Sequence, residues 1–193
     1  LREEVRGKIR DPAKQLGSTV LYVTHDQIEA MAMADKIAIM SLGRLLQYGA
    51  PMELYRRPNC AEVADFFGSV NWLTGRLSGS KIVETRIGRL EVSSRGDPGL
   101  DVLIGFRPEC LQIVDGSRRS GGNAFEAVLR SSTFLGDQFV YEAFVNHVLV
   151  TGKSRLIPAR DDRRLQLYID PAEIMVFPYS ESKDRVLAPE QRS

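Results

Sequence analysis

The spacing of apolar positions along the chain changes near residue 68. Before that point, helical spacing alternates with short continuous apolar runs, which predicts helices and strands in turn over residues 1–67. After it, the apolar runs are short and are separated by polar turns, a pattern typical of a sheet-rich domain. The two patterns predict an α+β chain with domains at 1–67 and 68–193.

The first segment contains helices and strands with local start and stop signals. Pro51 suits the first turn of a helix, because proline lacks an N–H that this turn leaves without a helical partner. Val63, Phe66 and Phe67 share one face of the last helix, and Gly68 ends it. The predicted elements are a polar helix over 1–17, a buried strand over 19–24, a helix over 26–35, strands over 36–41 and 44–49 joined at Leu42-Gly43, and helices over 51–57 and 59–67.

Two further signals concern helix ends. Asp26 can cap the helix that follows it, and Glu29, three residues later, can reach back to the helix entrance in a capping box. In the first helix, Gly7 and the Asp11-Pro12 pair predict a break, because proline removes a helical donor and Asp11 can cap a second piece.

Residues 68–193 consist almost entirely of predicted short strands. Stretches rich in glycine, proline and serine separate them, notably 95–99 and 115–123. The polar tail over 180–193 is expected to be frayed. The strands are predicted over 81–86, 89–94, 101–106, 126–136, 138–146, 147–152, 164–169 and 173–177.

Composition narrows the class of protein. The 193 residues include 26 basic and 25 acidic side chains, and this balance argues against nucleic acid or an anionic membrane surface as the main partner. Cys60 and Cys110 lie far apart, outside metal-ligand spacing, and indicate reduced thiols of a cytosolic protein. No apolar run approaches the roughly 20 residues of a membrane helix, and no signal peptide is visible. The chain begins with Leu1, so we expect a fragment of a longer protein.

His25 is the candidate residue for chemistry. It follows the predicted strand over 19–24 and precedes a helix, a position where open α/β sheets place groups that contact ligands. Its imidazole could hydrogen-bond a phosphate oxygen and help to position an attacking water. A histidine at a strand end is also often a purely structural hydrogen-bonding group, so His25 alone leaves both interpretations open.

The residues around His25 carry a resemblance to a known family. VTHDQIEAM, followed by ADKIAIMSLGRLLQYGAPMELYRRP, resembles the end of the nucleotide-binding domain of ABC-importer ATPases. In that family the histidine after VT is the switch histidine. The resemblance therefore implies that His25 contacts the γ-phosphate of ATP and orients the attacking water. Asp26 and Gln27 also fit the family, although helix capping alone explains Asp26 equally well.

The second segment resembles a domain that accompanies this ATPase. GFRPECLQI, FLGD and LQLYIDPAEIMVFP are similar to the TOBE domain of maltose, polyamine and ferric-iron importers. The resemblance implies a partial α/β ATPase lobe over 1–67, followed by an all-β, OB-like barrel of the TOBE or MOP type over 68–193. Within it, Arg107, Pro108 and Glu109 form either a structural turn with a salt bridge or a regulatory contact.

The phosphate-binding elements of a complete ATPase are not found in the sequence. HVLVTGKS imitates a P-loop at Gly152, but His147 replaces the first glycine and strand-like residues follow, so we interpret it as the end of a hairpin. LSGSK over 77–81 echoes the ABC signature on the wrong side of His25, and no Walker B run precedes that histidine. Full-length relatives use ATP and Mg²⁺, whereas this chain alone is expected to bind neither ATP nor any metal and to be inactive.

The resemblance also implies partners and a location. Full-length relatives energise solute uptake as a pair of ATPase subunits docked on membrane permeases, at the cytoplasmic face of the cell membrane. We expect this chain to form a homodimer and to bind no nucleic acid. The junction FFGSVNWLTG passes directly to Asn71, which favours the polyamine, iron or phosphonate branches over sugars. The alternative is a stand-alone binding module, since OB-like barrels also bind oxyanions or regulatory proteins.

Overall fold

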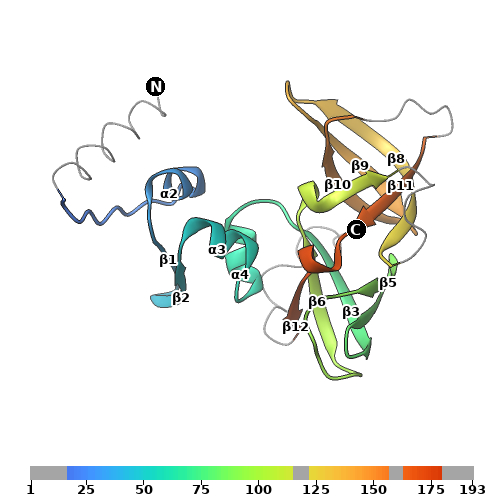
Figure 1. Ribbon diagram of the computed structural model, residues 1–193, viewed down its shortest axis with the longest axis horizontal. Coiled ribbons are helices and arrows are strands. Elements are labelled where there is room, and N and C mark those ends of the chain that lie inside the picture. Colours follow the sequence, from blue (N-terminus) through green and yellow to red (C-terminus); the bar gives the residue numbers. More distant parts are fainter. Residues whose placement is uncertain (1–16, 115–121, 157–162, 180–193) are drawn as a thin grey trace. The chain divides into compact units, whose positions relative to one another are not determined.

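The computed structural model describes residues 17–114, 122–156 and 163–179 (Figure 1). The chain divides into two compact units, residues 1–68 and 69–193. The predicted first helix with its break at Asp11-Pro12, most of the turn over 115–123 and the tail over 180–193 lie outside the described residues. The described part is mostly β with few helices, and none of its helices is long and apolar enough to cross a membrane.

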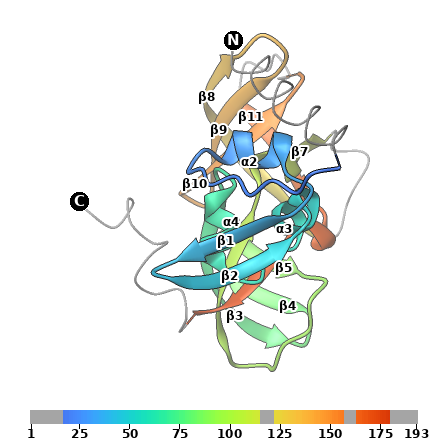
Figure 2. The same ribbon diagram turned by 90° about the vertical axis from the view of Figure 1, so that its left-hand side faces the viewer.

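A β-hairpin organises the first unit (Figure 2). Strand β1 (Ile37–Ser41) pairs antiparallel with β2 (Arg44–Gly49). Leu42 and Gly43 between them have φ values of 47° and 76°, the positive values that a two-residue type I′ loop requires. This confirms the predicted strands and turn. The helices of this unit are α2 (Gln27–Met33), α3 (Pro51–Arg56, with Pro51 in its first turn as predicted) and α4 (Ala61–Phe66).

A small apolar core holds the first unit together. Leu54 and Val63 are fully buried, and the Phe67 ring packs edge-on against Tyr55 with ring centroids 6.5 Å apart. Phe66, predicted to share the buried face with Val63 and Phe67, is 36% exposed. At 3.6 residues per turn, Phe66 lies about 60° around the helix axis from Val63, which is enough to bring it to the edge of the buried face.

The predicted buried strand over residues 19–24 is wrong. These residues form no strand, and their apolar side chains face solvent, with Leu21 90% and Val23 87% exposed. A strand is stable only when its backbone groups pair with a neighbour. The two strands that the structure describes in this unit, β1 and β2, pair with each other. The run 19–24 therefore has the composition of a strand but no sheet partner in the described part of the chain.

The second unit consists of two five-stranded antiparallel sheets, with the strand orders β10-β9-β8-β11-β7 and β12-β6-β3-β4-β5. Both sheets curl, and one apolar core that includes Phe106 and Tyr141 lies between them (Figure 1). Two short 3-10 helices, η1 (Pro108–Cys110) and η2 (Pro171–Glu173), connect strands. The strands are β3 (Asn71–Gly79), β4 (Ile82–Thr85), β5 (Gly88–Glu91), β6 (Asp101–Phe106), β7 (Leu111–Val114), β8 (Ala124–Phe134), β9 (Phe139–Val145), β10 (Val148–Ser154), β11 (Arg164–Ile169) and β12 (Met175–Pro178).

Each of the eight strand segments predicted after residue 68 overlaps a strand of the structure, and the predictions at 101–106 and 164–169 match β6 and β11 to the residue. Strands β3 and β7 were not predicted. Strand β3 contains Gly75 and Gly79, and because glycine has low strand propensity, the sequence pattern does not indicate a strand there. Gly75 is nevertheless required there, because a Cβ at this position would lie 2.5 Å from the Val83 side chain. The packing of this central strand thus requires a residue, Gly75, that strand propensity does not favour.

Side-chain amides also connect the two sheets. Asn123, directly before β8, is fully buried. Its Oδ1 accepts from the N–H of Glu91 at 2.6 Å, and its Nδ2 donates to the Glu91 carbonyl at 2.8 Å. Because Glu91 ends β5 of the other sheet, this pair of bonds fastens one sheet to the other. Asn71, in β3, makes an equivalent contact with β10.

Candidate functional site

His25 lies directly before the N-cap of α2, and its side chain is exposed. The helix after it is where the sequence predicts it, whereas the irregular segment 19–24 takes the place of the predicted strand before it. No residue that the structure describes is hydrogen-bonded to the imidazole. The side chain is therefore accessible to a ligand, and its role as a switch histidine stays a prediction.

Hydrogen bonds shape the backbone on both sides of His25. Asp26 Oδ1 accepts from the N–H groups of Ile28 and Glu29 at 2.8 and 3.1 Å, which confirms the predicted helix cap. The N–H of Asp26 donates to Thr24 Oγ1 at 2.9 Å. Thr24 thus takes the part in the capping box that was predicted for Glu29.

Glu29 instead binds residues that precede the helix. Its Oε2 accepts from Thr24 Oγ1 at 3.0 Å and from the Tyr22 hydroxyl at 3.2 Å. The hydrogen bond to Glu29, together with the charge of this carboxylate, raises the pKa of Tyr22. These bonds tie the segment 22–24 to α2, so that the backbone of His25 is held from both sides while its side chain is exposed.

The P-loop imitation over 147–154 is the end of a hairpin, as interpreted from the sequence. Asn146 and His147, with φ values of 48° and 66°, form the turn from β9, and β10 then runs through the glycine without a helix after it. Gly152 serves packing, because a Cβ there would lie 2.2 Å from Cζ of Tyr141. The glycine makes room for a buried tyrosine ring and not for a phosphate.

The second imitation also has a structural explanation. LSGSK over 77–81 ends β3 and makes the turn into β4. Across the residues that the structure describes, no group of three or more His, Cys, Asp or Glu side chains is placed to hold a metal ion.

The turn at Arg107, Pro108 and Glu109 has contacts that suit a structural role. Pro108 begins η1, and Arg107 is only 4% exposed. Glu109 Oε2 lies 3.4 Å from Nζ of Lys153 in β10. The salt bridge fastens the turn to β10. This contact agrees with the first of the two alternatives for this turn, a structural turn with a salt bridge.

Both cysteines are free thiols. Cys110 Sγ donates to Glu173 Oε2 at 3.3 Å. Burial, followed by this hydrogen bond to a carboxylate, raises the pKa of the Cys110 thiol to about 12. Cys110 is therefore held in its protonated, weakly nucleophilic form, and it is no candidate for covalent chemistry at neutral pH.

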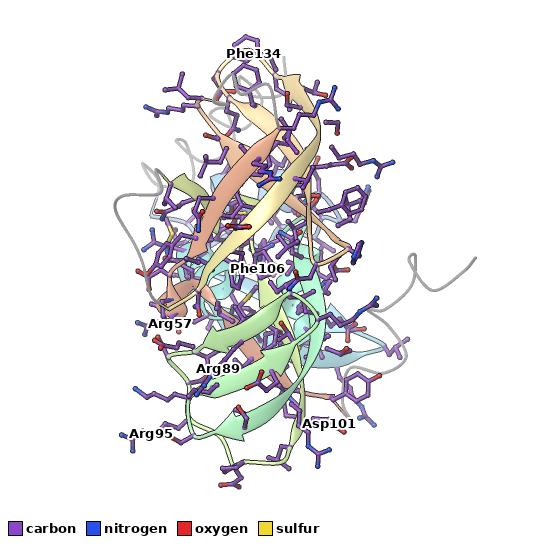
Figure 3. The ribbon with its side chains drawn as sticks, turned by 90° about the vertical axis from the view of Figure 1, so that its right-hand side faces the viewer. Arg57, Arg89, Arg95, Asp101, Phe106 and Phe134 are labelled. Carbon is purple, nitrogen blue, oxygen red and sulfur yellow. The ribbon has the colours of Figure 1, made fainter. Side chains whose placement is uncertain are left out.

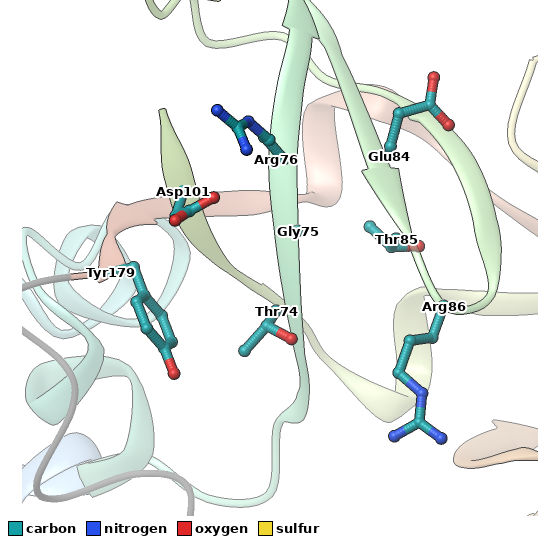
Figure 4. A pocket seen from close by; sticks show the side chains of 8 residues that line it. All are labelled: Thr74, Gly75, Arg76, Glu84, Thr85, Arg86, Asp101 and Tyr179. Carbon is teal, nitrogen blue, oxygen red and sulfur yellow. The ribbon is translucent and has the colours of Figure 1, made fainter. Parts of the chain in front are cut away.

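An open groove of about 440 Å³ lies beside β3, β4 and β6 (Figure 4). Two arginines face it together with two carboxylates, so the groove carries no net charge. An oxyanion site needs donors in excess of carboxylates, and the groove does not favour the oxyanion-binding alternative. Its lining residues are Thr74, Gly75, Arg76, Glu84, Thr85, Arg86, Asp101 and Tyr179.

No protein-family model matches the chain. Curated relatives do match it. The sn-glycerol-3-phosphate import ATP-binding protein UgpC of Roseobacter denitrificans is 33% identical over 190 residues, 92% of this chain and 51% of the relative. The spermidine/putrescine import ATP-binding protein PotA of Clostridium novyi is 37% identical over 70% of this chain and 38% of the relative. The Fe(3+) ions import ATP-binding protein FbpC of Fusobacterium nucleatum is 40% identical over 70% of this chain and 36% of the relative.

The chain spans about half the length, or less, of the curated relatives it matches. Among solved structures, the cytoplasmic molybdate-binding protein ModG matches with a TM-score of 0.46 and 12% identity, over 55% of this chain and 94% of that chain. The sequence matches with importer subunits extend through both units of the structure. The chain is therefore related to the C-terminal regions of the ATP-binding subunits of ABC importers.

Proposed function

We propose that the chain is the C-terminal part of an ATP-binding subunit that energises solute import. In this proposal, residues 1–67 form part of the ATPase lobe, and residues 68–193 form an OB-like regulatory barrel of the TOBE type. The observation that carries the proposal is the 33% identity to an importer subunit over 92% of the chain. This coverage includes the segment that contains His25, whereas similarity confined to the barrel would leave that segment unmatched and would not support a role in the ATPase.

His25 is the residue of this chain that we assign to ATP hydrolysis in the complete subunit. Its role is to contact the γ-phosphate and to orient the attacking water, while other segments of the subunit hold the rest of ATP and Mg²⁺. Such a positioning role needs a fixed backbone and an accessible side chain. The hydrogen bonds of Thr24 and Asp26 at the start of α2 fix the backbone on either side of His25. The imidazole is accessible because the side chain of His25 is exposed.

The partners follow from the same proposal. The complete subunit works as one of a pair, docked on membrane permeases at the cytoplasmic face of the membrane. The three relatives are named as import ATP-binding proteins for sn-glycerol-3-phosphate, for spermidine and putrescine, and for Fe(3+) ions. Their identities to this chain lie between 33% and 40%. The preference for a polyamine, iron or phosphonate solute over a sugar therefore rests on the direct junction at Asn71 alone.

The test compares two variants of the complete subunit in an ATP hydrolysis assay. His25→Ala is expected to slow hydrolysis by roughly 10²- to 10⁴-fold, as loss of a group that positions a proton or water does, and to change ATP binding only a few-fold. The chain contains two histidines, so His147→Asn is the matched control, since asparagine tolerates the positive φ of this turn. Wild-type hydrolysis by His25→Ala, or an upstream gene sequence without Walker A, signature and Walker B, contradicts the proposal.

A further inference from the structure

Three residues around His25 form a closed ring of hydrogen bonds. The N–H of Asp26 donates to Thr24 Oγ1 at 2.9 Å, and the Thr24 hydroxyl donates to Glu29 Oε2 at 3.0 Å. The N–H of Glu29 donates to Asp26 Oδ1 at 3.1 Å and closes the ring. His25 lies between Thr24 and Asp26 in the sequence, and its own side chain is exposed. The ring therefore constrains the backbone of His25 and leaves the imidazole accessible.

The bond between Thr24 and Asp26 encloses His25 in a turn. A threonine oxygen that accepts from the N–H two residues later forms an ST-turn, and His25 is the middle residue of this one. The turn restricts the φ and ψ angles of His25. It thereby determines the direction in which the His25 side chain leaves the backbone.

Glu29 determines which way the Thr24 hydroxyl points. A hydroxyl has one hydrogen to donate, whereas an ionised carboxylate only accepts. The hydrogen of Thr24 therefore lies towards Glu29, and the Thr24 oxygen is left to accept from Asp26. Donation to a charged acceptor is also stronger than donation to a neutral one, and it makes the donating oxygen a better acceptor in turn. Glu29 thus strengthens a turn that a threonine by itself holds only weakly.

We propose that Glu29 is a positioning residue for ATP hydrolysis and that it acts on His25 through the Thr24 hydroxyl. The inference rests on the proposed function, because it requires His25 to contact the γ-phosphate. A histidine that must orient a water is sensitive to small changes in its backbone, since a displacement of about 1 Å at a reacting group can cost roughly 10²-fold in rate.

Helix capping is the competing explanation for Glu29, because a carboxylate in the first turn also stabilises a helix. The contacts favour positioning. The cap of α2 is made by Asp26 Oδ1, which accepts from two N–H groups of the first turn. The carboxylate of Glu29 instead accepts from Thr24 and Tyr22, which both precede the helix. A capping role lowers the stability of the protein, whereas a positioning role lowers the turnover of a protein that remains folded.

The test measures ATP hydrolysis by variants of the complete subunit. Thr24→Val keeps the shape of the side chain and removes both of its bonds, and Glu29→Ala removes the acceptor. Each is expected to lower kcat roughly tenfold and to change the KM for ATP by less than about twofold, because other segments bind the nucleotide. Thr24→Ser keeps the hydroxyl and should restore most of the rate.

A second background shows whether both residues act through His25. In His25→Ala, the further change Thr24→Val or Glu29→Ala is expected to have no additional effect on kcat, because the group that they position is already lost. A residue with a purely structural role would slow the His25→Ala variant by the same factor as it slows the wild type.

Thr133→Val is the matched control for the loss of a threonine hydroxyl. Thr133 is exposed in β8. It precedes Phe134, which Figure 3 shows at the tip of the hairpin of β8 and β9, away from Phe106 in the core. The control is expected to keep the kcat and KM of the wild type.

Two results contradict the inference and leave the proposed function intact. In the first, Thr24→Val and Glu29→Ala hydrolyse ATP like the wild type while His25→Ala is slow. In the second, they slow His25→Ala by their full factor. Wild-type hydrolysis by His25→Ala instead removes the proposed function and the inference with it. If circular dichroism melting shows that Glu29→Ala does not fold, Glu29→Gln replaces it. Its neutral amide oxygen is a weaker acceptor, so kcat must still fall about threefold, and an unchanged rate overturns the inference.

Discussion

Asn71 and Thr151 face each other from the two sheets of the second unit and exchange a pair of hydrogen bonds. Asn71 Nδ2 donates to the Thr151 carbonyl, and Asn71 Oδ1 accepts from the Thr151 N–H, each at 2.8 Å. Two residues of adjacent antiparallel strands bond in the same reciprocal way. One side chain therefore replaces a ladder bond pair where the two sheets meet.

The first prediction concerns these amide contacts. Asn71→Ala leaves a backbone donor and acceptor of Thr151 without their partner and is expected to lower the free energy of unfolding by roughly 1–3 kcal/mol. Asn123→Ala should cost more, because Asn123 is fully buried. Urea unfolding, followed by fluorescence of the single tryptophan in β3, measures both. Changes below about 0.5 kcal/mol, the size of an ordinary surface substitution, would refute the assignment.

A side chain at position 152 is predicted to disturb the packing around Tyr141 and to destabilise the protein. Gly152→Ala places a Cβ 2.2 Å from Cζ and 2.3 Å from the hydroxyl oxygen of Tyr141, so the strand or the ring must move, and unfolding should become easier by about 1–3 kcal/mol. Combining it with Tyr141→Leu should give less than the sum of the two single effects. Strict additivity in this double-mutant cycle would show that the two residues do not clash.

Limited proteolysis is expected to cut first in the irregular segment before α2. Leu21 and Tyr22 are 90% and 48% exposed, whereas Phe106 and Tyr141, which chymotrypsin also recognises, are fully buried. Local exposure without strand pairing makes the backbone accessible to a protease. Mass spectrometry of the early fragments identifies the site. Initial cleavage within the second unit, or equal resistance along the chain, would contradict the prediction.

Cys110 makes stability depend on pH in the alkaline range. Its pKa rises from 9.0 to about 12, mainly through burial and then through Glu173, so the folded state keeps a proton that the unfolded chain releases. The resulting stabilisation is complete below pH 9 and is lost as the pH rises from 9 towards 12. The free energy of unfolding of the wild type should therefore fall more steeply than that of Cys110→Ala above pH 9. Parallel pH profiles for the two proteins would be the contrary result.

The 193-residue chain by itself is predicted to hydrolyse no ATP. The glycine of its P-loop imitation packs on Tyr141, and His25 is the one residue that we assign to the triphosphate. Without a phosphate-binding loop, the charge of the triphosphate has no adequate set of donors. A coupled assay with Mg-ATP measures the rate. Hydrolysis that disappears in His25→Ala would show that this prediction is wrong.

Much of the local structure could be predicted because neighbouring residues determine it. Leu42-Gly43 makes a tight turn by its own backbone preference, Pro51 begins a helix, and Asp26 caps the next one with its own side chain. Each of these features depends on contacts within a few residues. The motif around His25 is also local, so the sequence could place this candidate residue at the start of α2.

Sequence-based predictions of strands were wrong where a strand depends on pairing with residues far away along the chain. Residues 19–24 have the composition of a buried strand, yet the described residues give them no neighbour to pair with. Strand β3 shows the reverse case, because its glycines hide a strand that β4 and β6 hold on both sides. Strand propensity reports how well a residue fits a sheet and does not report whether a sheet is present.

The sequence by itself determined the relationship to importer subunits, the two segments with their different patterns, and the candidate role of His25, because all of these reside in the order of residues. Only the tertiary structure decided that Gly152 accommodates Tyr141 and that Asn71 and Asn123 fasten two sheets together. These relationships join residues that are far apart along the chain. Their energies arise from packing and from hydrogen-bond geometry, which exist only once the sheets have formed.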